Sequence, residues 1–182
     1  MISIKKALQK IAEKLRSEEA THTIYAYVGN DEGRQLTDTT HNYVSLMTSY
    51  TGTPRYNEEY FELVQTSLPL QTDPAYSYTC VGFRVKKDID ACYIAATERA
   101  LSTSTGTTKC STWPRVFLYR NNEIIMRSLG EGSQAESGER TGGFTHTITA
   151  LKAGDIVYGA FYKYSPGHLF TIEIANLLII KI

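Results

Sequence analysis

Residues 151–182 read LKAGDIVYGAFYKYSPGHLFTIEIANLLIIKI, and they end in the most apolar run of the chain, LLIIKI. A chain end left in solvent keeps its conformational entropy, so an ordered terminus has to be held by pairing or packing. Successive side chains of an extended run point to opposite faces of a sheet. We therefore predict an inner strand covered on both faces, with Leu177 and Ile179 on one side and Leu178, Ile180 and Ile182 on the other.

Upstream of this run, short segments rich in tyrosine, threonine and β-branched residues repeat the alternation of period two that is typical of strands. No helical pattern long enough for a crossover helix separates them, which favours an antiparallel sandwich over a parallel α/β sheet. The predicted strands are Thr21–Val28, Asn42–Thr48, Tyr60–Gln65, Tyr76–Lys86, Ala91–Thr97, Val116–Arg120, Glu123–Arg127, Phe144–Ala150, Asp155–Lys163 and Leu169–Ile182.

Turn chemistry indicates how some of these strands connect. Asn121 and Asn122 tolerate the positive backbone angles of a tight hairpin, so the strands on either side of them should pair. The YSPGH sequence at 164–168 predicts a turn between the last two strands. Residues 129–143 hold five glycines and little to bury, so we expect an exposed, mobile loop.

Composition limits the classes of partner. The chain has 182 residues, of which 42% are hydrophobic, which is enough for one main domain. Lys plus Arg and Asp plus Glu are balanced at 19 each, so no overall field favours nucleic acid. No apolar run is long enough for membrane insertion, and the N-terminus lacks a signal-peptide core. The odd number of cysteines, without zinc spacing, predicts free core thiols at Cys80, Cys92 and Cys110.

The opening residues, MISIKKALQKIAEKL, form the one convincing helical pattern. Apolar residues recur there at heptad spacing, and leucine at the a positions with isoleucine at d favours trimers or tetramers. Met1, Ile4, Leu8, Ile11 and Leu15 form this seam. The helix either packs on its own domain or mediates assembly and docking. We expect a helical stem over residues 1–18 and a β-sandwich head over residues 20–182.

The sequence offers little that points to catalysis. The histidines form neither a HExxH motif nor a His-x-His pair, and there is no G-x-S-x-G elbow or phosphate loop. Asp88 and Asp90 could bind a divalent cation, but their lysine neighbours fit a solvated edge or turn more simply. We therefore predict a protein that is not an enzyme and that has no cofactor and no metal site.

Binding suits this composition better, because aromatic faces stack on the C–H surfaces of sugars and tyrosine hydroxyls add hydrogen bonds. The candidate ligand-binding residues are Trp113, Tyr164, His168 and Tyr56. The alternative is that Trp113 caps a hydrophobic layer and the tyrosines are ordinary strand residues.

The second half of the chain, residues 76–182, resembles the globular-head fold shared by complement-type heads and tumour necrosis factor. The matching pieces are the RNNE hairpin at 120–123, the LKAGD step at 151–155 and the apolar last strand from Phe170 to Ile182. The resemblance implies a ten-strand jelly roll that forms compact trimers, with the last strand near the three-fold axis. A monomeric sandwich with a buried last strand stays possible.

The opening helix resembles the short heptad starts of tail-appendage proteins in phages of Gram-positive bacteria. Together the two resemblances imply a homotrimeric virion protein, made in the host cytoplasm, whose head binds a host-surface glycan or protein and whose N-terminal helix contacts other tail proteins. The absence of a Gly-X-Y stalk and of a signal sequence favours this setting. The candidate oligomerisation residues are Ile4, Leu8, Ile11, Leu15, Leu178, Ile180 and Ile182.

The alternative function is a cellular carbohydrate-binding or protein-interaction module that acts as a monomer or dimer, with the helix packed on the sandwich. A hydrolase on the same sandwich would need a carboxylate pair in a cleft, which sequence cannot place. The mass of the assembly in solution distinguishes the first two readings.

Overall fold

The structure is a computed structural model that describes residues 24–30, 33–70, 76–105 and 108–182. The predicted stem, with Ile4, Leu8, Ile11 and Leu15, lies outside the described residues. The described chain is built from strands, namely β1 (Tyr25–Asn30), β2 (Arg34–Leu36), β3 (Tyr43–Ser45), β4 (Arg55–Tyr56), β5 (Phe61–Pro69), β6 (Ser77–Val85), β7 (Ile89–Ser102), β8 (Cys110–Arg120), β9 (Glu123–Arg127), β10 (Gly130–Glu131), β11 (Gln134–Ala135), β12 (Arg140–Leu151), β13 (Ile156–Lys163) and β14 (Phe170–Lys181).

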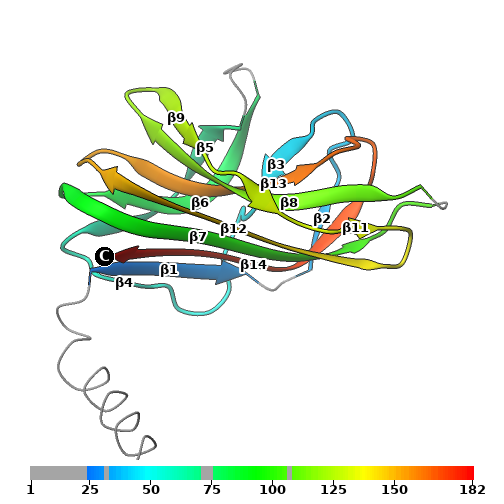
Figure 1. Ribbon diagram of the computed structural model, residues 1–182, viewed down its shortest axis with the longest axis horizontal. Helices are drawn as coiled ribbons and strands as arrows, with labels where there is room; N and C mark the ends of the chain where they lie inside the picture. The colour runs from blue at the N-terminus through cyan, green and yellow to red at the C-terminus, as the bar shows by residue number, and fades with distance from the viewer. Residues whose placement is uncertain (1–23, 31–32, 71–75, 106–107) are drawn as a thin grey trace, which may run out of the picture.

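These strands form two antiparallel sheets that pack face to face (Figure 1). The first sheet has the order β10-β12-β7-β14-β1-β4, with β2 also paired to β14, and the second has the order β11-β8-β13-β6-β5, with β3 on β13 and β9 on β8. From β6 onward the long strands cross from one sheet to the other at almost every connection, which is the winding of a double-sheet jelly roll. The predicted fold class, a mainly β antiparallel jelly-roll sandwich, is confirmed.

The ten strands predicted from alternation all occur. The Asn121–Asn122 hairpin is also confirmed, since both residues have positive φ angles, 52° and 66°, and β8 pairs with β9. The turn at 164–168 connects β13 to β14, and it carries the chain from the second sheet to the first. Three cysteines, Cys80, Cys92 and Cys110, are free and fully buried, as expected.

The C-terminal strand is central in its sheet but is not covered on both faces. β14 pairs with β7 on one side and with β1 on the other, and Leu177 and Ile179 are fully buried between the sheets. Leu178 and Ile180 are only half-buried, and Ile182 is 63% exposed. The prediction of a second covering layer is therefore wrong for the described part of the chain, because the second sheet packs on one face of the first sheet only.

Residues 129–143, expected as an exposed, mobile loop, are mostly exposed but contain strands, so the loop assignment is wrong. This segment holds β10, β11 and the start of β12, and Ala135 is fully buried. Its glycines allow close packing against β8: a Cβ on Gly130 would lie 2.2 Å from the Pro114 carbonyl oxygen, and one on Gly132 would lie 1.6 Å from that of Thr112. Glycine here indicates close approach of two backbones, which composition alone does not distinguish from flexibility.

Residues 33–70 belong to the same sandwich. Their strands pair with both sheets, since β2 and β4 join the first sheet while β3 and β5 join the second. Over the described ranges, no helix has the length and apolar character that a membrane span requires.

Candidate functional site

The outer face of the first sheet carries a grid of uncharged side chains. Register across β12, β7, β14 and β1 aligns three rows, and none of their members is Asp, Glu, Lys or Arg. The rows are Ile148–Tyr93–Ile180–Tyr25, His146–Ala95–Leu178–Tyr27 and Phe144–Thr97–Asn176–Gly29. We call this grid the uncharged face. A surface of this kind is unusual on a protein that works as a single chain, and it indicates an interaction site.

The uncharged face has both projections and a hollow. Ile148 and Phe144 project, with 62% and 40% of their surface exposed. His146 stacks on Tyr93 at 5.7 Å and on Phe144 at 5.3 Å. Ala95 has only a methyl group, and a hollow of about 300 Å³ lies there, lined also by Tyr27, Tyr93, Thr97, Phe144, Asn176 and Leu178. The face could therefore hold an apolar side chain of another molecule.

Beyond the row of Phe144, Thr97 and Asn176, three charged residues of the first sheet pair with one another. The Glu173 carboxylate accepts hydrogen bonds from Arg99 Nε at 2.9 Å and from Arg140 Nε at 2.9 Å. The hydrogen bond from Arg140 is the main cause that holds the pKa of Glu173 below its ordinary value. The border is thus ion-paired around Glu173, and the centre of the face stays apolar.

The outer face of the second sheet has a different character, because aromatic rings meet across three of its strands, one pair stacked and one pair edge-on. The rings of Trp113 on β8 and Tyr162 on β13 lie 4.5 Å apart at an interplanar angle of 29°, and Tyr43 on β3 lies 4.8 Å from Tyr162. Two guanidinium groups lie over the ends of this stack, Arg115 at 5.5 Å from the Trp113 ring and Arg127 at 5.9 Å from the Tyr43 ring. We call Trp113, Tyr162 and Tyr43 the aromatic ladder.

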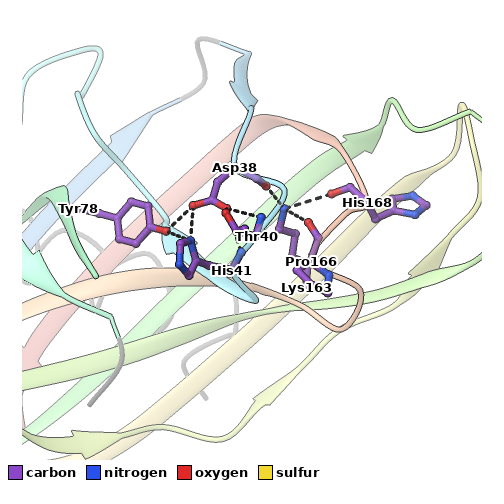
Figure 2. Close-up of polar contacts among 7 residues, drawn as sticks. All are labelled: Asp38, Thr40, His41, Tyr78, Lys163, Pro166 and His168. Carbon is purple, nitrogen blue, oxygen red and sulfur yellow. Dashed lines mark hydrogen bonds and ion pairs between the residues drawn. The ribbon is translucent and has the colours of Figure 1, made fainter. Parts of the chain in front are cut away.

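A polar network fixes the loop that leads into the ladder (Figure 2). The Asp38 carboxylate accepts hydrogen bonds from the Tyr78 hydroxyl, from His41 Nδ1 at 2.7 Å and from the Thr40 backbone N–H at 2.8 Å. Burial raises the pKa of Asp38, but the hydrogen bonds from Tyr78 and His41 outweigh it and hold the pKa well below its ordinary value. Burial and the bond to Asp38 raise the pKa of Tyr78.

Lys163 connects the same loop to the turn after β13. Its side chain is fully buried, and Nζ donates hydrogen bonds to the backbone carbonyls of Asp38, of Pro166 at 2.5 Å and of His168 at 3.3 Å (Figure 2). Burial lowers the pKa of Lys163. An ammonium group surrounded by carbonyls in this way is a structural tie, since it lies where no substrate could reach it.

The contacts of Asp38 and those of Lys163, which together we call the clasp, hold the loop that leads to Tyr43 in position. Next to the clasp, the Asn42 side-chain amide donates to the carbonyls of Lys163 and Tyr164, each at 2.9 Å, and the backbone N–H of Lys163 donates to the Asn42 carbonyl at 2.9 Å. Tyr43 then pairs with Tyr162 in the β3–β13 register. The clasp therefore completes the ladder with a residue that lies far from Trp113 in the sequence.

The four candidate ligand-binding residues do not lie together as one cluster. Trp113 belongs to the ladder, and Tyr164 follows Tyr162 at the end of β13, with 69% of its surface exposed. His168 is buried, and its Nε2 lies 2.8 Å from Ser102 Oγ. Tyr56, on β4 of the other sheet, packs on the core ring of Phe83 at 5.4 Å. Ligand binding by these residues stays a prediction, and only Trp113 and Tyr164 lie on neighbouring strands at the surface.

Sequence reasoning missed Tyr43, Tyr162 and both arginines of the ladder. Each of these residues lies in or near a predicted strand. Tyr158, Tyr162 and Tyr164 fall on the same face of β13 and its end, and this spacing could have indicated an aromatic surface. Within the described ranges, no group of three or more His, Cys, Asp or Glu side chains could hold a metal ion.

Comparison with known proteins gives a fold-level similarity. No protein-family model and no curated protein matches the chain. Among solved structures it is similar to the Eiger TNF of S. frugiperda, at 12% identity and a TM-score of 0.44 over 88% of this chain and 92% of that one. It is also similar to murine APRIL at pH 5.0, at 10% identity and a TM-score of 0.44 over 88% of this chain and 99% of that one. The jelly-roll assignment itself rests on the strand order.

Proposed function

We propose that this chain is a homotrimeric virion protein whose β-sandwich head binds a host-surface receptor through a glycan, and whose N-terminal residues attach it to other tail proteins. The observation that carries the proposal is the uncharged face. Its apolar rows surround the C-terminal strand, and nothing in the described chain packs over them.

Other copies of this chain are the partner that suits the uncharged face. The hollow at Ala95 and the projecting Ile148 occupy different positions on one surface, so a projection of one copy can enter the hollow of the next. A contact between different parts of identical surfaces is heterologous, and it generates a closed ring when the rotation permits. The heptad seam, with leucine at a and isoleucine at d, favours a ring of three or four, and the resemblance to trimeric heads favours three.

The aromatic ladder suits the receptor-binding role because it lies on the opposite side of the sandwich. A trimer contact at Ile148 and the hollow at Ala95 on the first sheet leaves the outer face of the second sheet free. Aromatic rings with adjacent arginines can stack on sugar C–H surfaces and donate hydrogen bonds to sugar hydroxyls. Three such sites on one particle gain avidity without a single tight contact.

Light scattering coupled to size-exclusion chromatography tests the assembly. We expect a mass near three times the 20.4 kDa of one chain. Ile148→Glu should reduce the mass to that of one chain, because it places a charge in the contact. Ile125→Glu is the matched control: Ile125 is 45% exposed on β9 of the second sheet, so this variant should keep the trimer. A wild-type monomer at high concentration would refute the proposal.

The attachment role has a separate test. Deleting residues 1–16 should weaken incorporation into particles, and it should leave glycan binding by the head unchanged. A truncated chain that is incorporated as well as the full chain would contradict the attachment role without affecting the receptor-binding role.

A further inference from the structure

A cavity of about 450 Å³ lies at the edge of the first sheet, where β4 pairs with β1. It is separate from the aromatic ladder, which lies on the other sheet, and it is larger than the hollow at Ala95. Three segments form its walls: the end of β1, the turn at 51–55 before and into β4, and the middle of β14. The volume is within the range of cavities that hold a small ligand.

Among the described residues that line this cavity there is one cation, Arg55, and no anion. Arg55 is exposed, and its guanidinium group forms no hydrogen bond or ion pair with any residue that the structure describes. The described lining residues are Tyr27, Gly29, Asn30, Thr51, Gly52, Thr53, Arg55, Ile174 and Asn176, among which there is no Asp or Glu. Elsewhere on the first sheet, Arg99 and Arg140 both pair with Glu173. Arg55 is therefore available to an external anion.

The polar groups beside Arg55 are held in fixed positions. The Tyr27 hydroxyl donates to Asn176 Oδ1 at 2.8 Å, and Asn176 Nδ2 donates to Thr97 Oγ1 at 3.1 Å. Because its proton is used in this chain of bonds, the Tyr27 oxygen is left to accept a hydrogen bond from a ligand hydroxyl. The Thr53 hydroxyl can donate as well as accept.

Two glycines keep the cavity open. A Cβ on Gly29 would lie 2.5 Å from Asn176 Oδ1 and 2.8 Å from the Tyr27 hydroxyl, so any side chain there would break their hydrogen bond. Gly52 has a φ angle of 73°, which other residues adopt at a cost, and a Cβ there would meet no atom within 4 Å. The turn at 51–55 thus forms one wall of the cavity without filling the cavity with a side chain at Gly52.

We propose that this cavity binds an anionic, hydroxyl-rich group, namely the acidic unit of a saccharide or phosphorylated polyol. A guanidinium group binds a carboxylate or phosphate through two parallel hydrogen bonds. The Tyr27 and Thr53 hydroxyls pair with ligand hydroxyl groups, and the Tyr27 ring and Ile174 contact ligand C–H groups. A neutral sugar would leave Arg55 unmatched, so the site discriminates in favour of an acidic ligand.

This inference deepens the proposed receptor-binding function, because it names a class of receptor unit and a second place that contacts it. The cavity shares Tyr27, Gly29 and Asn176 with the uncharged face, and it opens at the β4 edge, away from Ile148 on β12. The trimer contact is therefore centred on Ile148 and the hollow at Ala95 and leaves this edge open. One chain forms the cavity, so ligand binding there does not need the trimer. Failure of the trimer test and failure of the cavity test are therefore distinguishable. The folded monomer expected from Ile148→Glu should bind the same probes as the full assembly.

Isothermal titration calorimetry of the full chain tests the site with three probes: 3′-sialyllactose, glycerol 3-phosphate and lactose. We expect one or both acidic probes to bind at least ten times more tightly than lactose. The acidic probe that binds identifies the source of the anion, a carboxylated sugar or a phosphorylated polyol.

Arg55→Gln should weaken binding of that probe at least tenfold. Arg84→Gln is the matched control, since it removes the same charge from an exposed arginine that pairs with Glu62 on the second sheet. We expect this control to bind as the wild type does. The proposal is overturned if neither acidic probe binds, if lactose binds equally well, or if Arg84→Gln weakens binding as much as Arg55→Gln.

Discussion

The two outer faces of this sandwich come from strands of similar composition, yet they differ in what they leave exposed. The first sheet presents aligned rows without a single charge, whereas the second presents stacked rings with arginines over both ends. The second sheet is also extended by its own chain, since β3 pairs with β13 and the clasp holds the loop that leads into β3. This difference is the reason why we propose association through the first face and binding of a polar ligand at the aromatic ladder of the second.

The interior between the two faces supplies the largest predicted effect. Glu98 on β7 is 4% exposed, and neither carboxylate oxygen has a well-formed hydrogen bond with the described residues. Burial raises the pKa of Glu98 to about 7, and the nearby Thr112 hydroxyl offsets only part of this. The folded state therefore keeps a proton that the unfolded state releases near its ordinary pKa of 4.5, so stability falls as pH rises between these values.

Glu98→Gln should remove this dependence. Relative to wild type, its free energy of unfolding should improve by about 3 kcal/mol between pH 4 and pH 8, because one pKa unit corresponds to about 1.4 kcal/mol. Urea denaturation at the two pH values measures the change. Glu131→Gln, an exposed carboxylate on β10, is the control and should show little difference. Equal pH dependence in wild type and Glu98→Gln would mean that Glu98 is solvated.

Lys163→Met tests whether the second face depends on the clasp. The methionine fills the space of the lysine stem but leaves three carbonyls without their donor, at a cost of about 2 kcal/mol in the free energy of unfolding. Hydrogen exchange should increase around residues 38–43, and the mass of the assembly should not change. Lys87→Met, at an exposed lysine paired with Glu59, should have almost no effect on stability. Loss of the trimer in Lys163→Met would show that the two faces are coupled.

Tyr78→Phe removes one donor to Asp38. A hydrogen bond to a charged group contributes about 1.5 kcal/mol, so the variant should lose about that much at pH 7. Because the folded-state pKa of Asp38 is depressed, this stabilisation is present above the ordinary pKa of 3.8 and is lost as pH falls through the folded-state value. The deficit of the variant should therefore shrink in acid, as measured by urea denaturation at pH 7 and pH 2. Tyr76→Phe, at an exposed tyrosine whose ring lies 4.3 Å from the His41 ring, serves as control.

The smallest effect separates the functions of the two faces. Trp113→Leu should weaken glycan binding about tenfold, or about 1.4 kcal/mol, while the trimer remains. Phe144→Leu, on the uncharged face, should leave glycan binding unchanged. A glycan array followed by titration with the best-bound glycan measures both. If both variants bind like wild type, the aromatic ladder is not the receptor site.

Much of the fold could be predicted because alternation is a local property. β14, β13 and the Asn121–Asn122 hairpin follow from residues that are close in sequence, and each was found. The pairs β10–β12 and β11–β8 were missed because a Gly-rich segment has the same composition whether it is mobile or packed against another strand. The sequence also could not predict that His168 and Tyr56 lie apart from the other two candidate ligand-binding residues. Their exposure depends on which residues pack over them in the fold.

Period, turn chemistry and hydrophobicity act over a few neighbouring residues, so the sequence alone predicts the antiparallel strands, the central position of the last strand and the core cysteines. The open face of that last strand, the rings that meet in the ladder, and the position of Arg55 without a partner among the described residues follow only from the folded structure. These features depend on the order of strands in the two sheets and on contacts between residues far apart in the chain. A local pattern carries no information about such contacts.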